Sequence, residues 1–262
     1  MTDSTRFLAT AIQAAQAAAA IQRFHTGDAD LDISTKSSRT DLVTMVDRLC
    51  EERIRHVIGA AFPDHAILGE EEGLSAGDPD YRWIVDPLDG TLNYAHGFPY
   101  YCASVALEVR GRVEVGAVMD ICRNELFTAI RGQGAWLNGA PIRVSSETEP
   151  GSALLATGFA YDQESINRNI EIFARVMPDV RAIRRPGAGA LDLCQVAAGR
   201  FDGFWELTLR PWDVAAGSLI VEEAGGTVTG HRGQHFELDN PVLVSSNGVL
   251  HAQLLELLAI PD

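Results

Sequence analysis

About a third of the way along the chain, a short apolar segment ends in two acidic residues. Residues 83–85 are Trp-Ile-Val, and they lead into Asp-Pro-Leu-Asp-Gly-Thr at 86–91. The proline removes a backbone donor and ends strand pairing, so Asp86 and Asp89 are expected to converge on one point across a turn. The Leu88 carbonyl between them is free to face the same way, because a turn leaves backbone groups unpaired. Three hard oxygen ligands of this kind suit Mg²⁺.

The Gly-Thr pair that follows adds a candidate phosphate site. Gly90 allows close approach of the backbone, and the amides of Gly90 and Thr91 could point at a phosphate oxygen where a short helix begins. Taken alone, the segment fits an ordinary acidic turn equally well, because Asp-Pro and Asp-Gly pairs are common in turns. The choice between turn and metal site depends on other acidic segments.

Two more acidic segments bear on that choice. Glu70 is the first of three consecutive glutamates after the apolar pair Ile67-Leu68 and a glycine. We expect Glu70 to turn inward, while the next two glutamates stay on a solvated face. Asp213, in Pro-Trp-Asp-Val-Ala-Ala-Gly at 211–217, is expected at a helix N-terminus. There it is either a metal ligand or simply the N-cap of that helix.

Polar residues also surround the start of a predicted helix at 41–61. Asp41 is its expected N-cap, and Asp47, judged by itself, could be a surface acid. Lys36 lies in the polar stretch just before this helix and is the only lysine among 21 basic residues. On composition alone, Lys36 needs no explanation beyond a general preference of this chain for arginine. Its ammonium group is, however, compact and on a flexible stem, whereas the guanidinium of arginine is planar.

Composition narrows the class of protein. The 262 residues carry a formal net charge of −15, a field that repels phosphate backbones and argues against general nucleic-acid binding. A phosphorylated substrate would therefore need metal ions or a local nest of donors. No apolar run approaches the ~20 residues of a membrane helix, and no signal peptide is expected. The four cysteines form no Cys-x-x-Cys pair, which argues against zinc and disulfides and favours a reducing cytoplasm.

The first half of the chain is expected to contain two helices and a set of short strands. An amphipathic helix is predicted near the start, with Phe7, Leu8, Ile12 and Phe24 on its apolar face, and a second helix at 41–61. Strands are predicted at 66–68, 82–85, 102–109, 113–119 and 126–130. The last three are expected to form an antiparallel meander.

Strands and helices alternate in the second half. Strands are predicted at 153–157, 180–183, 201–205, 227–228 and 242–245, and helices at 163–176, 188–198, 213–224 and 250–258. Alternation of this kind predicts an α/β arrangement of helices packed on a mixed or parallel sheet. With no long linker between them, the halves 1–145 and 146–262 are expected to share one compact body.

Three motifs in this order carry a resemblance to a known family. Gly-Glu-Glu at 69–71, Trp-Ile-Val-Asp-Pro-Leu-Asp-Gly-Thr at 83–91 and Trp-Asp-Val-Ala-Ala-Gly at 212–217 resemble those of the inositol monophosphatase family, in particular its bacterial inositol 1-monophosphatases. The wider superfamily includes fructose-1,6-bisphosphatases and nucleotide 3′-phosphatases. The resemblance runs from Lys36 through residues 222–226. It implies a layered αβαβα sandwich, a homodimer, two or three Mg²⁺ ions and frequent inhibition by Li⁺.

The resemblance also implies roles for particular residues. The implied metal ligands are Glu70, Asp86, the Leu88 carbonyl, Asp89 and Asp213. The implied catalytic residues are Lys36 in a mobile loop, Asp47, Glu70 and Thr91, with the Asp47–Thr91 pair orienting the attacking water. The implied substrate contacts are Asp89, Gly90, Thr91, Ala188, Gly189, Glu206 and Asp213. Relatives often carry Ser or Thr where this chain has Ala188 and Gly189, which leaves the substrate open.

The expected reaction is hydrolysis of a phosphate monoester of a small polyol by metal-activated water. Mg²⁺ held by the four carboxylates would invert the local negative charge, clamp the phosphate and stabilise the leaving alkoxide. Glu206 and the complete Trp212-Asp213 pair favour inositol 1-phosphate, which would yield inositol and phosphate. The alternatives are a sister specificity, for histidinol phosphate, fructose 1,6-bisphosphate or a nucleotide 3′-phosphate, or a non-catalytic interaction protein with this fold.

Overall fold

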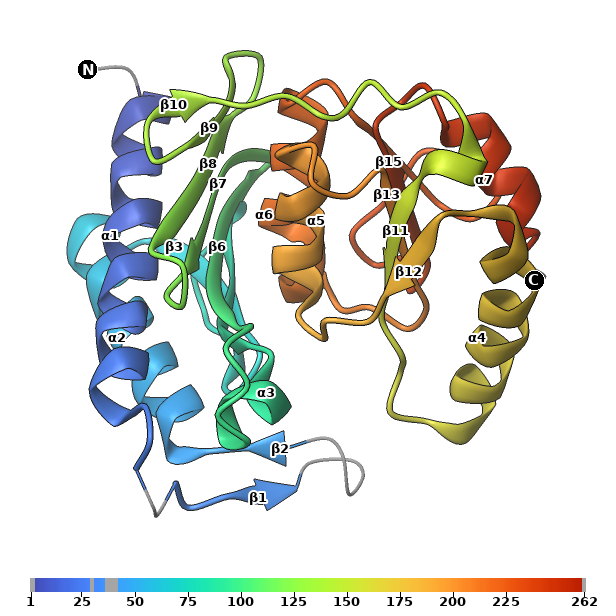
Figure 1. Cartoon of the computed structure of the whole chain (residues 1–262). Coiled ribbons are helices and arrows are strands. Elements are labelled where there is room, and N and C mark those ends of the chain that lie inside the picture. Colours follow the sequence, from blue (N-terminus) through green and yellow to red (C-terminus); the bar gives the residue numbers. More distant parts are fainter. Residues whose placement is uncertain (1–2, 29–30, 36–41, 261–262) are drawn as a thin grey trace.

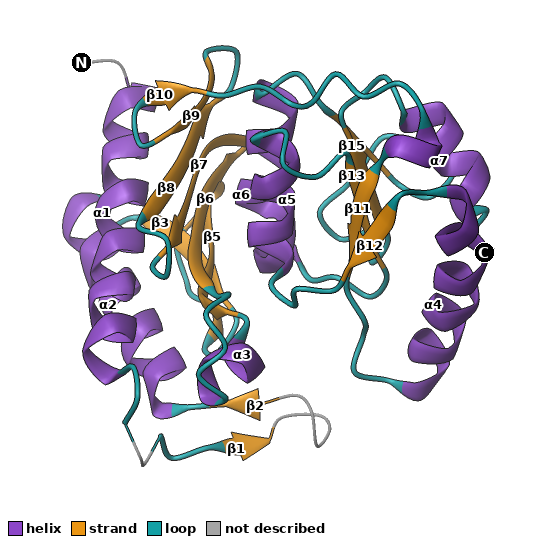
Figure 2. Ribbon diagram, in the orientation of Figure 1, coloured by secondary structure: helices purple, strands orange, loops and turns teal. Residues whose placement is uncertain are grey.

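Two sheets alternate with three layers of helices in this structure, a computed structural model that describes residues 3–28, 31–35 and 42–260. Helices α1 (Asp3–His25) and α2 (Met45–Ala61) cover one face of an eight-stranded sheet. Helices α5 (Gly189–Ala197) and α6 (Pro211–Glu223) lie between that sheet and a five-stranded one, whose outer face is covered by α4 (Gln163–Val176) and α7 (His251–Leu258) (Figure 1, Figure 2). The predicted αβαβα sandwich is confirmed.

The larger sheet is mainly antiparallel. Its strands are β3 (His65–Gly69), β4 (Gly73–Leu74), β5 (Asp78–Asp89), β6 (Cys102–Val109), β7 (Arg112–Asp120), β8 (Glu125–Ile130), β9 (Gly134–Leu137) and β10 (Ala140–Pro141). Their order is β10-β9-β8-β7-β6-β5-β3-β4, and each neighbouring pair is antiparallel except β3–β5. The predicted meander of β6, β7 and β8 is therefore confirmed.

The smaller sheet is mixed. Its strands are β11 (Leu154–Thr157), β12 (Ala182–Arg184), β13 (Gly203–Glu206), β14 (Thr227–Thr229) and β15 (Leu243–Ser246). In the order β12-β11-β13-β15-β14, the first three run parallel, and β15 is antiparallel to both of its neighbours. The remaining elements are the short pair β1 (Ser34–Thr35) and β2 (Leu42–Val43), the helix α3 (Thr91–Ala95), and 3₁₀ turns at Pro150–Ser152 and Met177–Asp179. Of the two arrangements predicted for this half, a mixed or a parallel sheet, the structure has the mixed one.

Helix α1 packs an alanine face against the sheet, and three of the large apolar residues predicted for that face are partly buried against the same core: Phe7, Leu8 and Ile12. Ala11, Ala14 and Ala18 are fully buried, with spacing that places them on one side of the helix. Phe24 is 80% exposed, so its predicted place on the apolar face is wrong. Alanine side chains let the helix lie close to the sheet, so burial here depends on small size as much as on apolar area.

Helix α2 begins later than predicted, after a cap that the sequence did not single out. Thr44 is its N-cap: the Thr44 hydroxyl accepts the Val46 N–H at 3.1 Å, and Asp47 accepts the Thr44 N–H at 2.8 Å. This reciprocal capping box satisfies donors that the first helical turn leaves free. Asp41, the predicted cap, lies outside the described residues.

Helix α6 is apolar on all sides because it is packed between the two sheets. Residues 214–221 are all buried. Small residues permit close packing: a Cβ on Gly217 would lie 2.7 Å from Leu193 of α5, and a Cβ on Gly116 of β7 would lie 3.0 Å from Ala216. The sequence Val-Ala-Ala-Gly thus sets how near α6 can lie to its neighbours, and with it the position of Asp213.

The core between the sheets draws side chains from both predicted halves. Ile84 and Val118 from the first half join Leu193, Phe204 and Leu219 from the second in one apolar cluster. The halves therefore share a core, while a division into domains at 145/146 stays a prediction.

All four cysteines are free thiols, as expected from their spacing. Within the described ranges, no helix is both long enough and apolar enough to span a membrane.

Candidate active site

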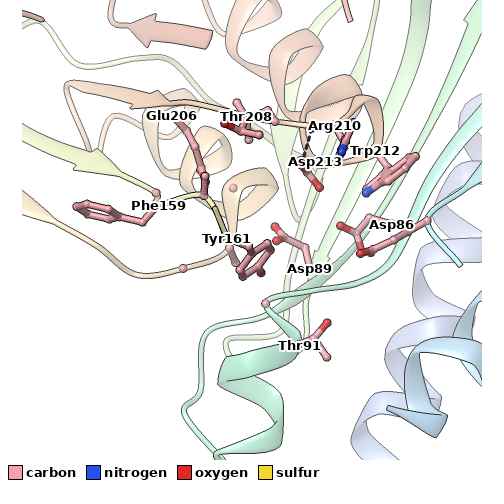
Figure 3. A pocket seen from close by; sticks show the side chains of 18 of the residues that line it. Asp86, Asp89, Thr91, Phe159, Tyr161, Glu206, Thr208, Arg210, Trp212 and Asp213 are labelled. Carbon is pink, nitrogen blue, oxygen red and sulfur yellow. Dashed lines mark hydrogen bonds between the residues drawn. The ribbon is translucent and has the colours of Figure 1, made fainter. Parts of the chain in front are cut away.

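A cavity of about 350 Å³ opens where the ends of β5 and β13 meet the first turns of α3, α5 and α6. The predicted metal ligands and substrate contacts all line it: Glu70, Asp86, Leu88, Asp89, Gly90, Thr91, Ala188, Gly189, Glu206 and Asp213. In Figure 3, the side chains of Asp86, Asp89 and Asp213 face one space, and Glu206 lies on the opposite wall. Of the predicted catalytic residues, Asp47 lies behind Thr91, and Lys36 is outside the described residues.

The Asp-Pro-Leu-Asp segment forms a bulge within β5, whereas the sequence predicted that its proline would end the strand. Asp86 lies opposite Ser104 and Asp89 opposite Cys102, so the β5 side carries one extra residue between them. Pro87 cannot donate to the ladder, and a bulge is a place where such a residue is tolerated. The Asp86 carboxylate accepts the Leu88 N–H at 3.0 Å, which fixes the bulge locally.

Asp89 is held by the first turn of α5. One of its oxygens, Oδ2, accepts the Ala190 N–H at 2.8 Å, and the Cys102 thiol donates to the same oxygen at 3.7 Å. Amides at a helix N-terminus favour a carboxylate. The carboxylate is thus anchored to an element more than one hundred residues further along the chain.

Burial and like charge make this cluster electrostatically costly. Burial raises the pKa of Asp86 well above its usual range, and the negative charges of Glu70, Asp89 and Asp213 raise it further. Burial likewise raises the pKa of Asp89 to about 6, opposed by the Ala190 N–H and reinforced by Glu70. Buried carboxylates that repel one another favour protons or a cation.

This donor set fits Mg²⁺ in chemistry and charge. Carboxylates and a carbonyl are the oxygen ligands that Mg²⁺ prefers, and the negative charge of Glu70 raises the pKa of both Asp86 and Asp89. Among the residues that the structure describes, no three His, Cys, Asp or Glu side chains are drawn together tightly enough to enclose an ion as they stand. The fit therefore depends on donor type, burial and mutual repulsion.

The Thr91 hydroxyl contacts the Asp47 carboxylate, as the sequence proposed. Thr91 Oγ1 donates to Asp47 Oδ1 at 2.8 Å and lies 3.0 Å from the Leu88 carbonyl. The other Asp47 oxygen accepts from the backbone and hydroxyl of Thr44, at 2.8 and 2.6 Å. Asp47 is fully buried, so its interpretation as a surface acid is wrong. Its helix-capping bonds hold it facing Thr91, while the catalytic role of the pair stays a prediction.

Asp213 is the third residue of α6, and the alternative that it is the N-cap is wrong. The cap position is Arg210, and Pro211 begins the helix. Asp213 Oδ2 accepts the Arg210 N–H at 2.7 Å and so closes the first turn. This bond turns the carboxylate back toward the start of α6, where it lines the cavity.

Glu206 ends β13 and forms the far wall of the cavity. Burial raises the pKa of Glu206 well above the usual range, and the negative charges of Asp213, Asp192 and Asp89 raise it further. The positive charge of Arg185 lowers it. Gly158 permits this placement, because a Cβ there would collide with the Glu206 carboxylate.

Some residues at the cavity were not singled out from the sequence. The loop before α4 contributes Phe159 and Tyr161, and the segment before α6 contributes Thr208 and Arg210 (Figure 3). None belongs to a chemical motif, and only the fold brings them to the cavity.

Gln22 supports the β5 bulge from behind and was also missed. It is fully buried in α1, and its Nε2 donates to the Pro87 carbonyl at 2.9 Å. The available signal was a polar side chain one helical turn after Ala18, on the alanine face of the helix.

The chain belongs to the inositol monophosphatase family, whose sequence profile matches residues 3–260. The Nus factor SuhB of Pasteurella multocida is 44% identical over 219 residues, which cover 83% of this chain and 82% of that protein. The Nus factor SuhB of Escherichia coli K12 is 42% identical over 239 residues, or 90% of this chain and 89% of that protein. The resemblance seen in the motifs is confirmed.

Solved structures agree with this assignment. An inositol monophosphatase from Anabaena (Nostoc) superposes with a TM-score of 0.89 at 38% identity, covering 99% of this chain and 98% of its own. The extragenic suppressor protein SuhB from Bartonella henselae gives a TM-score of 0.90 at 38% identity, covering 94% and 95%.

Proposed function

We propose that this protein hydrolyses phosphate monoesters of small polyols, with inositol 1-phosphate as substrate, and that it uses two or three Mg²⁺ ions. The observation that carries the proposal is one cavity lined by Glu70, Asp86, Asp89 and Asp213, with Thr91 beside them. Membership of the inositol monophosphatase family supports it.

The proposed mechanism divides the work between metal and protein. Bound Mg²⁺ would supply Lewis acidity to the phosphoryl group and the leaving oxygen. Glu70, Asp86, the Leu88 carbonyl, Asp89 and Asp213 would hold the ions. Thr91 donates a hydrogen bond to Asp47, so its Oγ1 can accept a hydrogen bond from the attacking water and orient that water toward phosphorus. Glu70 would contribute as a second acceptor near the same water.

The proposed substrate contacts come from opposite walls of the cavity. The amides of Gly90 and Thr91 would donate to phosphate oxygens, and Gly90, with φ of 93°, adopts the left-handed conformation needed for that turn. The carboxylates of Glu206, Asp89 and Asp213 would accept hydrogen bonds from polyol hydroxyls. Ala188 and Gly189 line the same space without a hydroxyl of their own.

A phosphate-release assay tests the proposal. Purified protein would be given inositol 1-phosphate, histidinol phosphate, fructose 1,6-bisphosphate and a nucleotide 3′-phosphate, with Mg²⁺ or EDTA and with or without Li⁺. We expect Mg²⁺-dependent, Li⁺-sensitive release that is fastest from inositol 1-phosphate. Asp86→Asn and Asp213→Asn should each nearly abolish release while the protein stays folded by circular dichroism.

Full activity in EDTA, or in either variant, would overturn the metal mechanism. Faster turnover of another substrate would keep the mechanism but replace the substrate. Homodimer formation and a cytoplasmic location belong to the same proposal, and light scattering of the purified protein tests the first.

A second candidate is a function that does not need catalysis, and the relatives named Nus factor SuhB favour it. The Asp86→Asn variant separates the two. If it replaces the E. coli relative in a strain lacking that protein, a non-catalytic role is supported. Failure of the variant, where the unchanged chain succeeds, would tie function to catalysis.

A further inference from the structure

A buried carboxylate lies behind the turn that carries Glu70, outside the cavity. It belongs to Glu51 of α2, which is fully buried. We propose that Glu51 is a positioning residue that sets the orientation of Glu70 for metal binding. This inference rests on the proposed function, in which Glu70 is a Mg²⁺ ligand.

Glu51 holds the two peptide groups that follow Glu70. Its Oε2 accepts the Glu71 N–H at 2.8 Å, and its Oε1 accepts the Glu72 N–H at 3.0 Å. The Glu71 N–H belongs to the peptide plane that begins at the Glu70 carbonyl. Holding this plane restricts rotation about the Glu70 Cα–C bond, and with it the direction in which the Glu70 side chain leaves the turn. Holding the next plane as well fixes the backbone of Glu71 between them.

Gly69 gives Glu51 the room to do this. A Cβ on Gly69 would collide with the Glu51 carboxylate. The φ of Gly69 is not among the positive values in the chain, so its conformation does not require glycine. The glycine of the Gly-Glu-Glu motif is thus explained by the approach of a side chain from 18 residues earlier in the sequence.

Arg55 compensates the charge of Glu51 and closes the other end of the turn. Its Nε donates to Glu51 Oε1 at 2.9 Å, and its guanidinium also donates to the Gly73 carbonyl at 2.7 Å. A buried carboxylate is costly unless it is paired and hydrogen-bonded, and Glu51 has both kinds of partner. The turn from Gly69 to Gly73 is therefore held from behind at both ends, with Glu70 on its cavity side.

The test measures Mg²⁺ affinity of the purified full-length chain by isothermal titration calorimetry, without substrate. Glu51→Ala is expected to weaken Mg²⁺ binding by about 10-fold, the scale on which outer partners of metal ligands act. Glu70→Ala should weaken it at least as much. The double variant should bind no more weakly than Glu70→Ala alone, because Glu51 acts only through Glu70.

The chain supplies a matched control at a remote turn. The Glu223 carboxylate accepts the Gly132 N–H at 2.7 Å and the Gly134 N–H at 2.8 Å, so it too holds a turn through two backbone amides, outside the cavity. Glu223→Ala should lower the thermal midpoint of the metal-free protein and leave Mg²⁺ affinity within about 2-fold. A purely structural role for Glu51 would give this same pattern.

Gly69→Ala provides an independent test that keeps Glu51. It should weaken Mg²⁺ binding by displacing the carboxylate, and it should add less than about 2-fold in a Glu51→Ala background, where the space is free. Glu51→Gln, which keeps the size and one acceptor oxygen, should be intermediate and serves if Glu51→Ala does not fold.

The outcomes separate the two proposals. If Glu70→Ala weakens Mg²⁺ binding but Glu51→Gln and Gly69→Ala do not, the positioning role is wrong. If Glu70→Ala leaves the affinity unchanged, the proposed metal site itself is wrong.

Discussion

The hydroxyl of Thr91 lies between two acceptors, the Asp47 carboxylate and the Leu88 carbonyl, and its single proton can go to only one of them. Donation to Asp47 frees both the carbonyl for a metal and the Thr91 oxygen for water. Thr91→Val keeps the shape but removes the hydroxyl, so kcat is expected to fall by roughly 10²- to 10⁴-fold while KM changes far less. Steady-state kinetics with saturating Mg²⁺ would measure both.

Thr91→Ser is the control for this prediction, since it restores the hydroxyl without the methyl group. It should recover most of the lost kcat. A Thr91→Val enzyme with unchanged kcat would show that the pair with Asp47 only stabilises the fold.

Asp89 should make the stability of the metal-free protein depend on pH in a defined direction. Its pKa in the folded chain is about 6, against a usual value of 3.8. Between these values the folded state binds more protons than the unfolded state, so the contribution of Asp89 to the free energy of unfolding falls as pH rises. It is fully present below about pH 4 and lost above about pH 6. The Asp89→Asn variant has no titrating group at this position, so its free energy of unfolding does not fall with pH for this reason.

Urea unfolding in EDTA at several pH values between 4.5 and 7.5 checks the prediction. Relative to the unchanged chain, Asp89→Asn should gain stability as pH rises to 6 and then level off. A difference that is independent of pH would show that Asp89 is not protonated more readily in the folded state.

At the residue scale, the sequence predicted the residues that could carry chemistry better than the residues that hold them in place. The acids at 70, 86, 89 and 213 could be found because each lies in a short motif beside an apolar segment. Gln22 and Glu51 could not, because their partners lie 65 and 20 residues away and neither forms a local pattern. A side chain that hydrogen-bonds to the backbone of a distant turn produces no recognisable pattern in a single sequence.

At the scale of elements, the sequence predicted the longer helices and strands but missed the irregularities within them and five short strands: β1, β2, β4, β9 and β10. The strand β6 has the predicted bounds 102–109, and α4 has the predicted bounds 163–176. The bulge at Pro87 was missed, because a proline that stops a strand and one that sits in a bulge look alike in sequence. Both depend on which backbone groups the neighbouring strand presents.

Two helical glycines should respond in opposite ways to alanine. In α6, a Cβ at Gly217 would lie 2.7 Å from Leu193, so Gly217→Ala should destabilise the protein by about 1–3 kcal/mol through overpacking. In α2, nothing lies within 4 Å of a Cβ at Gly59, so Gly59→Ala should stabilise it by about 0.5–1 kcal/mol. Urea unfolding would measure both.

A stabilising Gly217→Ala would mean that α5 and α6 can move apart at no cost. In that case α6 would not fix the position of Asp213 as tightly as its packing implies.

At the scale of the whole molecule, the two predicted halves are joined by charge as well as by their shared core. Arg200, after α5, forms a two-pronged pair with Glu125 of β8, at 2.5 and 2.6 Å. Arg131, after β8, pairs with Glu222 of α6 at 2.5 Å. Such pairs fix geometry more than they add stability when partly exposed. The cavity needs both halves, since Asp86 and Asp89 come from one and Asp213 from the other.

Because core and cavity are shared, we expect the halves to unfold together. Hydrogen exchange followed by mass spectrometry can compare β6 and β13 within the same molecule. Their slowest amides should report opening free energies that agree within about 1 kcal/mol, as all-or-none unfolding requires. Mg²⁺ at 100 times its Kd for one site should raise both by about 2.7 kcal/mol, because the ion binds only when both halves are folded. If the amides of β13 exchange at a much lower free energy than those of β6, the second half opens by itself. If, in addition, Mg²⁺ slows exchange only in β6, Asp213 is not needed to hold the ion.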